Sequence, residues 1–211
     1  MRKLAALPNP RSRRAGEPRL AADLLELPHA DPLTGLPTRR VLERLLAGAF
    51  EEGGWKRRCS IVKIDIDAFW RYNGDPGPQA GDLALFIIGL ILKCHARRRD
   101  VVGRYGGDEF LILLSRAGHR RALSFAERIT WDVASQFTGE GSRLTVSCGV
   151  ASREGSMTRY GQLMESADGA LHAAKCQGGN RVVVAHPRLA TALLEHRAHL
   201  RASRVLRRDI A

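Results

Sequence analysis

The chain has 211 residues and a formal net charge of +12, from 34 lysines and arginines against 22 aspartates and glutamates. With 44% hydrophobic and 27% charged residues its composition is that of an ordinary globular protein, which excludes a disordered chain, a collagen and a small disulfide-rich scaffold. The longest apolar run, residues 83–92, is too short to span a bilayer, and residues 1–20 lack the apolar segment of a secretory signal.

The excess positive charge lies mostly at the two ends of the chain. Residues 1–28 carry a net charge of +3 and residues 187–211 a net charge of +4, so more than half of the total lies there. A sequence pI near 10.5 is typical of proteins that bind nucleic acid or anionic membranes. Because the charge is concentrated in the tails, a role in binding nucleic acid or a membrane surface is a weaker hypothesis than those drawn from the motifs of the folded domain.

The four cysteines are far apart in the sequence and show no CxxC spacing; they are Cys59, Cys94, Cys148 and Cys176. We therefore predict reduced cysteines in the core of a cytoplasmic protein, in place of a disulfide framework or a zinc site.

The predicted elements alternate between helices and strands. Residues 1–29 form a basic, proline-containing extension with a short helix at 21–27, residues 30–186 form the folded domain, and residues 187–211 form a basic helical tail. Within the domain, periodicity predicts helices at 38–49, 80–98, 120–137 and 160–176, and strands at 60–66, 101–104, 109–114, 144–151 and 182–185. This order predicts an α/β (α+β) sandwich, a mixed five-stranded sheet surrounded by helices.

Three local features accompany these elements. Thr38 is predicted to cap the first helix of the domain, and residues 74–78, GDPGP, are predicted to form a turn. The second helix is predicted to carry six apolar residues on one side: Leu83, Phe86, Ile87, Leu90, Ile91 and Cys94.

Acidic residues follow two of the predicted strands. Asp65 and Asp67 follow the apolar run at 61–64 and project to the same side, while Asp108 and Glu109 lie at the tip of the glycine hairpin that joins the next two strands. If the strands are neighbours, Asp65, Asp108 and Glu109 converge at one edge of the sheet. Clustered carboxylates repel one another unless a cation neutralises them, and Mg²⁺ prefers oxygen ligands shared with substrate phosphates. This arrangement suits two-metal nucleotidyl transfer; the alternatives are a solvated strand end and an ordinary hairpin.

Residues 104–110, RYGGDEF, carry the signature of the GGDEF-domain diguanylate cyclases, which join two GTP into cyclic di-GMP. The chain resembles this family over residues 30–186, with its motifs in the family order. The similar segments are DPLTGLPTRR at 31–40, DIDAFWRYN at 65–73, GD at 81–82, LTVSCGVA at 144–151 and ADGALHAAKCQGGNRV at 167–182. The resemblance implies a nucleotidyl-cyclase or polymerase-palm type of fold.

The resemblance also implies a metal site. Asp65, the backbone carbonyl of Ile66, Asp108 and Glu109 would hold two Mg²⁺ or Mn²⁺ ions per active site, and Asp108 and Glu109 would help to deprotonate the attacking 3′-hydroxyl. The active site would form between two facing subunits, each with one GTP, so the resemblance implies a homodimer.

Further residues would bind GTP itself. The resemblance places Gly106 and Gly107 against the α-phosphate, where the missing Cβ lets the phosphate approach the backbone, and Lys175 on the β- and γ-phosphates. Three residues belong to the predicted substrate site: Phe69, Asn73 and Asp82. Asn73 and Asp82 would recognise guanine, whose N1–H and N2–H₂ donors suit a carboxylate and an amide, whereas adenine would leave the acid unpaired.

The resemblance also implies an inhibitory product site, because Arg97 and Asp100 form an RxxD pattern five residues before the glycine signature, as in the family. Arg97 would bind guanine O6/N7 or a phosphate of cyclic di-GMP, Asp100 would accept from guanine, and Arg128 would add a contact from the next helix. The alternative for RRRD is a favourable charge cluster at a helix end.

Three positions depart from the family pattern near the triphosphate. Trp70 stands where the family has lysine, Pro78 where it has histidine, and Gly179 where it has arginine. Each charge-assisted contact is worth roughly 1.5–3 kcal/mol, so GTP affinity falls unless Arg71 or Arg181 compensates. The sequence therefore leaves two main hypotheses, an active diguanylate cyclase and a catalytically weak domain that binds cyclic di-GMP as an effector.

Overall fold

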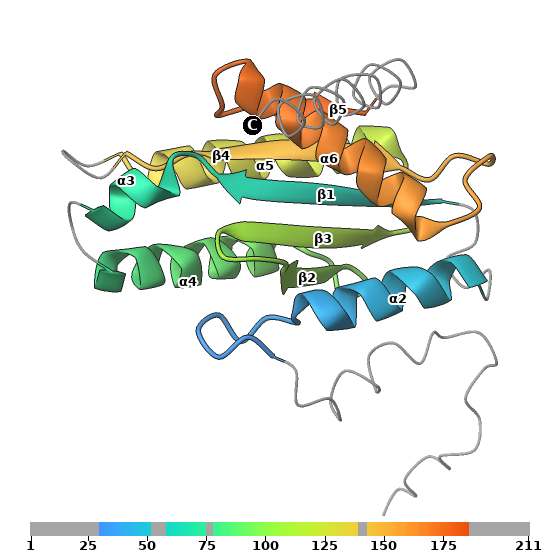
Figure 1. The fold of residues 1–211 in the computed structure, drawn as a ribbon, viewed down its shortest axis with the longest axis horizontal. Coiled ribbons are helices and arrows are strands. Elements are labelled where there is room, and N and C mark those ends of the chain that lie inside the picture. Colours follow the sequence, from blue (N-terminus) through green and yellow to red (C-terminus); the bar gives the residue numbers. More distant parts are fainter. Residues whose placement is uncertain (1–29, 52–57, 75–77, 139–142, 186–211) are drawn as a thin grey trace, which may run out of the picture.

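The computed structural model describes residues 30–51, 58–74, 78–138 and 143–185. Its centre is a five-stranded sheet in the order β2-β3-β1-β4-β5 (Figure 1). The strands are β1 (Cys59–Ile66), β2 (Val101–Arg104), β3 (Glu109–Ser115), β4 (Val146–Ser152) and β5 (Val182–Val184). Only the pairing of β4 with β5 is parallel, so the predicted mixed five-stranded sheet is confirmed.

Helices cover both faces of the sheet (Figure 1). They are α2 (Arg39–Glu51), α3 (Phe69–Gly74), α4 (Pro78–His95), α5 (His119–Gln136) and α6 (Tyr160–Cys176). The helix predicted at 160–176 and the strand predicted at 101–104 are confirmed in full, and the other predicted elements of the domain differ from the structure by a few residues at their ends. The short helix α3 was not predicted, and the predicted helix at 21–27 and the helical tail lie outside the described residues.

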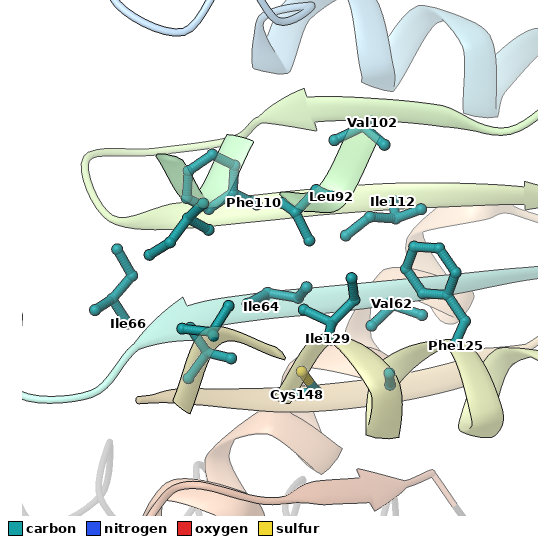
Figure 2. Packing of buried hydrophobic residues seen from close by; sticks show 14 of the residues in the cluster. Val62, Ile64, Ile66, Leu92, Val102, Phe110, Ile112, Phe125, Ile129 and Cys148 are labelled. Atoms are coloured by element: carbon teal, nitrogen blue, oxygen red, sulfur yellow. The ribbon is translucent and has the colours of Figure 1, made fainter. Parts of the chain in front are cut away.

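The central strand β1 separates two hydrophobic cores because its side chains alternate between the two faces of the sheet. Val62, Ile64 and Ile66 pack against α4 and α5 in the larger core, part of which is drawn in Figure 2. Cys59 and Ile61 face α2 and α6 in the smaller core. Lys63 and Asp65 continue this second face toward the hairpin, so the sheet itself brings charged side chains beneath α6.

Helix α4 corrects one expectation from the sequence. Its six predicted apolar residues do share one side, but four of them, Leu83, Phe86, Leu90 and Cys94, are exposed. The buried side consists of other small or apolar residues: Ala84, Leu85, Ile88, Gly89 and Leu92. The helix therefore has apolar residues all round, and among the described residues its outer face is uncovered.

Two of the four cysteines lie in the core, as predicted, and two do not. Cys59 and Cys148 are buried in the two cores, and burial raises the pKa of the Cys59 thiol to about 11 and that of Cys148 to about 12. Cys94 and Cys176 are exposed, which corrects their predicted place in the core. All four are unpaired thiols, as predicted. In the described part of the chain, no helix is long and apolar enough to cross a membrane.

Candidate active site

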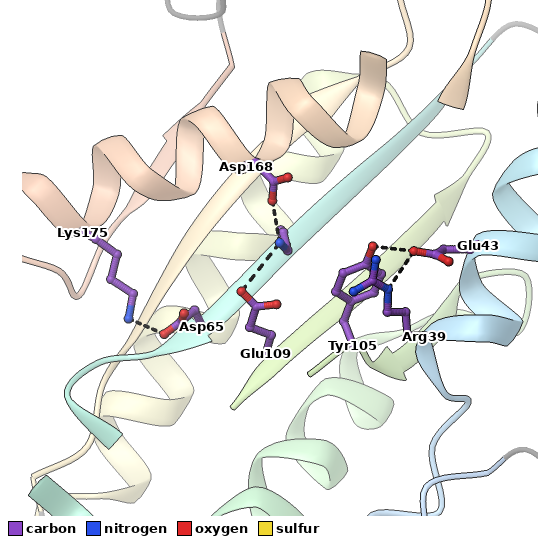
Figure 3. A network of polar contacts seen from close by, with 8 residues as sticks. Arg39, Glu43, Asp65, Tyr105, Glu109, Asp168 and Lys175 are labelled. Carbon is purple, nitrogen blue, oxygen red and sulfur yellow. Dashed lines mark hydrogen bonds and ion pairs between the residues drawn. The ribbon is translucent and has the colours of Figure 1, made fainter. Parts of the chain in front are cut away.

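The two predicted acidic positions meet because β1 and β3 are antiparallel neighbours. Asp65 lies directly opposite Glu109 in this register, and the Ile66 amide donates to the Asp108 carbonyl at 3.3 Å. Asp65 and Glu109 therefore project from adjacent strands to the same face of the sheet (Figure 3). The sequence predicts that these carboxylates converge if the two strands are neighbours, and the structure confirms this for Asp65 and Glu109.

Lys175, in the last turn of α6, reaches the same point. Its ammonium group is ion-paired with Asp65 and donates to the Ile66 carbonyl at 3.0 Å, and it lies 3.0 Å from a carboxylate oxygen of Asp67. Two of the oxygens predicted to bind a metal ion, one carboxylate and one carbonyl, thus already converge on a single cationic nitrogen. Lys175 is 30% exposed at the end of its helix, so a phosphate can reach it.

The charges in this cluster shift two ionisation equilibria. Burial raises the pKa of Asp65; the Lys175 ammonium opposes this rise, and the neighbouring charges of Asp108 and Glu109 add to it, which leaves the pKa above its ordinary value. Burial lowers the pKa of Lys175, but its bonds to Asp65 and Asp67 outweigh burial and raise it overall. The Lys175 ammonium thus favours the carboxylate form of Asp65, and a divalent cation at its oxygen would do the same.

The donor set fits a hard divalent cation. Carboxylate and carbonyl oxygens are the ligands of Mg²⁺, and here they surround a positive charge and face a solvent-accessible edge of the sheet. Within the described ranges, no three carboxylate, imidazole or thiol side chains lie close enough to hold an ion in this arrangement. An ion at Asp65 and Ile66 therefore needs Lys175 to move away, toward the phosphates that the sequence assigned to it.

Asp67 anchors the neighbouring loops. Its carboxylate accepts hydrogen bonds from the Thr145 hydroxyl at 2.8 Å, the Ser147 hydroxyl at 2.7 Å and the Asn180 amide at 2.8 Å, besides its ion pair with Lys175. Burial raises the pKa of Asp67, but these bonds outweigh it and hold the pKa below its ordinary value. Asp67 thereby ties the end of β1 to β4 and to the glycine turn after α6.

Arg104 joins the hairpin tip to the start of the domain. Its guanidinium donates to the Gly107 carbonyl at 2.7 Å and to the Asp31 carboxylate at 3.1 Å. Gly106 and Gly107 are exposed, as a phosphate-binding role requires, and a Cβ on Gly106 would lie 3.3 Å from Glu109 Oε2. The glycine at 106 therefore leaves room for Glu109 as well as for a ligand.

The predicted guanine-binding residues lie around α3 and the start of α4. Asp82 is exposed near the start of α4. Phe69 is buried in the larger core, which gives it a packing role in this structure. Asn73 lies in α3, but its side chain is outside the described residues, so the base-recognition roles stay predictions.

The predicted product site is already occupied by contacts within the chain. The Asp100 side chain is only 1% exposed; one of its oxygens accepts from the Ser115 amide at 3.1 Å, and the other accepts from the Arg97 amide at 3.0 Å and the Arg121 guanidinium at 2.5 Å. Arg97 and Arg128 are exposed. Two arginines are therefore accessible to a ligand, whereas the aspartate is not accessible until Arg121 moves.

The departures from the family pattern have local explanations at two positions. Trp70 is 72% exposed, and Arg71 stacks on its ring at 5.0 Å. Gly179 has φ +72°, and a Cβ there would lie 2.9 Å from the Asp67 carboxylate, so the close approach of Asp67 favours glycine. Arg181 donates to the Gly179 carbonyl and to Gln177, which holds it on the turn and away from a compensating role. The side chain of Pro78 is outside the description.

Sequence reasoning missed four supporting residues of this site: Asp31, Lys63, Arg104 and Arg121. Asp67 was noted only as the companion of Asp65. Their partners are 21 to 105 residues away in the sequence, so local patterns gave no signal for the pairs. A lysine inside a run of β-branched residues is the one hint, because it requires a buried partner.

Comparison with known proteins gives a consistent answer. Residues 28–181 match the family described as diguanylate cyclase, GGDEF domain. Diguanylate cyclase A of Treponema denticola is 33% identical over 81% of this chain and 48% of its own length, and diguanylate cyclase DgcM of Escherichia coli is 37% identical over 79% and 41%. This chain therefore spans less than half of these relatives. The solved coiled coil and GGDEF domain of DgcB from Caulobacter crescentus, in complex with c-di-GMP, superposes with a TM-score of 0.69 at 30% identity, covering 79% of this chain and 92% of the other.

Proposed function

The chain belongs to the GGDEF family of diguanylate cyclases, and from this premise we propose that it condenses two GTP into cyclic di-GMP with release of two pyrophosphates. The observation that carries the proposal is the pairing of Asp65 with Glu109 on adjacent strands, with Lys175 on the Asp65 carboxylate and the Ile66 carbonyl. This geometry places hard oxygen ligands beside a lysine that can exchange a carboxylate for a phosphate.

Asp65, the Ile66 carbonyl, Asp108 and Glu109 would hold Mg²⁺ or Mn²⁺, which supplies charge to activate a hydroxyl and to stabilise a leaving pyrophosphate. Lys175 then pairs with the β- and γ-phosphates of GTP. The exposed backbone of Gly106 and Gly107 receives the α-phosphate, and Asp82 and Asn73 select guanine. Since the product contains two GTP-derived halves and each chain offers one such site, two copies must face each other during the reaction.

The test is incubation of the protein with GTP and Mg²⁺ at several protein concentrations, with cyclic di-GMP measured by chromatography. We expect product whose rate rises more than linearly with protein concentration, and loss of at least about 100-fold in the Glu109→Gln variant. Lys93→Met, which removes an exposed lysine of α4, is the control and should retain the wild-type rate. Absence of cyclic di-GMP at every protein concentration would refute the proposal.

A second candidate function is binding of cyclic di-GMP without its synthesis. Trp70 and Gly179 favour it, because neither position supplies the phosphate cation that the family pattern has, and Arg181 is held on its own turn. In this case the synthesis assay gives no product while calorimetry detects binding of cyclic di-GMP that depends on Arg97. The two assays together decide between the candidates.

Product binding at the RxxD site is part of both candidates, and the Arg121–Asp100 pair sets its affinity. Guanine can bond to Asp100 only after the Arg121 ion pair opens, so we expect Arg121→Ala to bind cyclic di-GMP about tenfold more tightly than the wild type in calorimetry. Arg120→Ala, which removes an exposed neighbour, should leave the affinity unchanged. Weaker binding by Arg121→Ala would show instead that Arg121 contacts the ligand itself.

A further inference from the structure

Lys63 is a buried charge in the middle of the central strand. Its side chain is 9% exposed, and its ammonium group lies 2.5 Å from Asp168 of α6 and 3.6 Å from Glu109 of β3; both acids are labelled in Figure 3. The ring of Tyr105 lies 5.1 Å from the same nitrogen. A lysine in this position loses its hydration, and it is tolerated because two carboxylates and an aromatic face replace the water.

Five charged side chains lie in a row across this face of the sheet, and the two neighbouring acids, Asp65 and Glu109, each have a lysine on the outer side. In order, they are Lys175 of α6, Asp65 of β1, Glu109 of β3, Lys63 of β1 and Asp168 of α6. Two like charges directly opposite on neighbouring strands destabilise a sheet, and here each of the two acids has a lysine on its outer side. The two lysines differ in freedom, because Lys175 is 30% exposed at a helix end whereas Lys63 is enclosed by β1, α6 and Tyr105.

We propose that Lys63 is a positioning residue that holds Glu109 in place and sets the affinity of the carboxylate site for a divalent cation. Lys175 can move to a phosphate when an ion binds, but the Lys63 ammonium stays beside Glu109 as a fixed positive charge. It therefore competes with a cation for the Glu109 carboxylate and repels it through a partly dehydrated region. Asp168 moderates this effect, because it draws the same ammonium away from Glu109. The inference rests on the proposed role of Glu109 as a metal ligand.

The test measures Mn²⁺ binding to the protein without nucleotide, by electron paramagnetic resonance of the free ion. We expect Lys63→Met, which keeps the length of the side chain without its charge, to bind Mn²⁺ about tenfold more tightly than the wild type. We expect Asp168→Asn to bind Mn²⁺ more weakly by several-fold, because the ammonium then turns fully to Glu109. Lys93→Met is the matched control and should leave binding unchanged, since Lys93 is exposed on α4.

Opposite signs for the two variants are the signature of the proposal, because mere loss of structure would weaken binding in both. Unchanged, weaker or undetectable Mn²⁺ binding by Lys63→Met would overturn it, as would a change of the same sign in Asp168→Asn. Should Lys63→Met fail to fold, Asp168→Asn alone decides, and binding as tight as that of the wild type would count against the proposal. The GTP assay tests the proposed function separately, so a protein that makes no cyclic di-GMP can still show the two opposite changes.

Discussion

Replacing Gly149 with alanine is expected to lower the free energy of unfolding by more than about 3 kcal/mol, a large part of the stability of a domain of this size. Gly149 lies in the middle of β4, where the backbone of α6 passes directly over the strand. A Cβ at this position would lie 2.3 Å from the Ala167 carbonyl oxygen and 2.4 Å from the Leu171 amide nitrogen. Both atoms belong to helix backbone, so α6 would have to move away from the sheet as a unit.

Urea unfolding of the two proteins measures the loss. Gly161→Ala, in α6 itself, is the control, because a Cβ there meets no atom within 4 Å. Since alanine favours helix over glycine, this change should leave the free energy of unfolding unchanged or raise it slightly. Since α6 also carries Lys175 and Asp168, a displaced helix would separate both residues from their partners on β1. A loss below about 1 kcal/mol would mean that α6 packs with more slack than this structure shows.

Most of the fold could be predicted because the deciding signals are local. The β-branched run before Asp65 and the two glycines between apolar arms predict a strand and a hairpin from neighbouring residues alone. Once these strands are adjacent, the pairing of Asp65 with Glu109 follows from their places at the strand ends. The pair of carboxylates proposed to bind a metal ion could therefore be predicted without long-range information.

The face of α4 could not be predicted, because its apolar residues surround the whole helix. Leu83 and Leu90 are as hydrophobic as Leu85 and Leu92, and only packing against the sheet decides that the second pair is buried. A hydrophobic period separates the two sides of a helix when the other side is polar, and here it is not.

The charged supports of the site escaped prediction for a different reason. The Asp100 carboxylate was assigned to a ligand because its spacing from the glycine signature suits a product site, yet its partner Arg121 comes from the next helix and closes over it. Lys63 finds Asp168 across 105 residues of sequence. Burial of a charge is decided by partners of this kind, so short motifs point to the carboxylates proposed to react but not to the residues that hold them.

Asp67 is expected to be the most important of these supports, and Asp67→Ala should lower the free energy of unfolding by about 3 kcal/mol. The change leaves the Thr145 and Ser147 hydroxyls and the Asn180 amide without their acceptor, and it removes one of the two carboxylates on Lys175. Asn180 follows directly after two glycines with positive φ, and its backbone amide donates to the Asp67 carboxylate. Hydrogen exchange at the Asn180 amide should therefore accelerate more than exchange in β1.

Urea unfolding with Asp132→Ala as the control separates this role from a general effect of losing an aspartate. Asp132 forms a hydrogen bond with His95 on the outer surface of α4 and α5, where its side chain is 42% exposed, so its loss should cost less than about 1 kcal/mol. Equal losses in the two variants would mean that the Asp67 contacts contribute no more than a polar contact at the surface. A larger loss in Asp67→Ala, with rapid exchange at Asn180, would establish that one carboxylate joins the end of β1, the start of β4 and the turn after α6, and so keeps Lys175 beside Asp65.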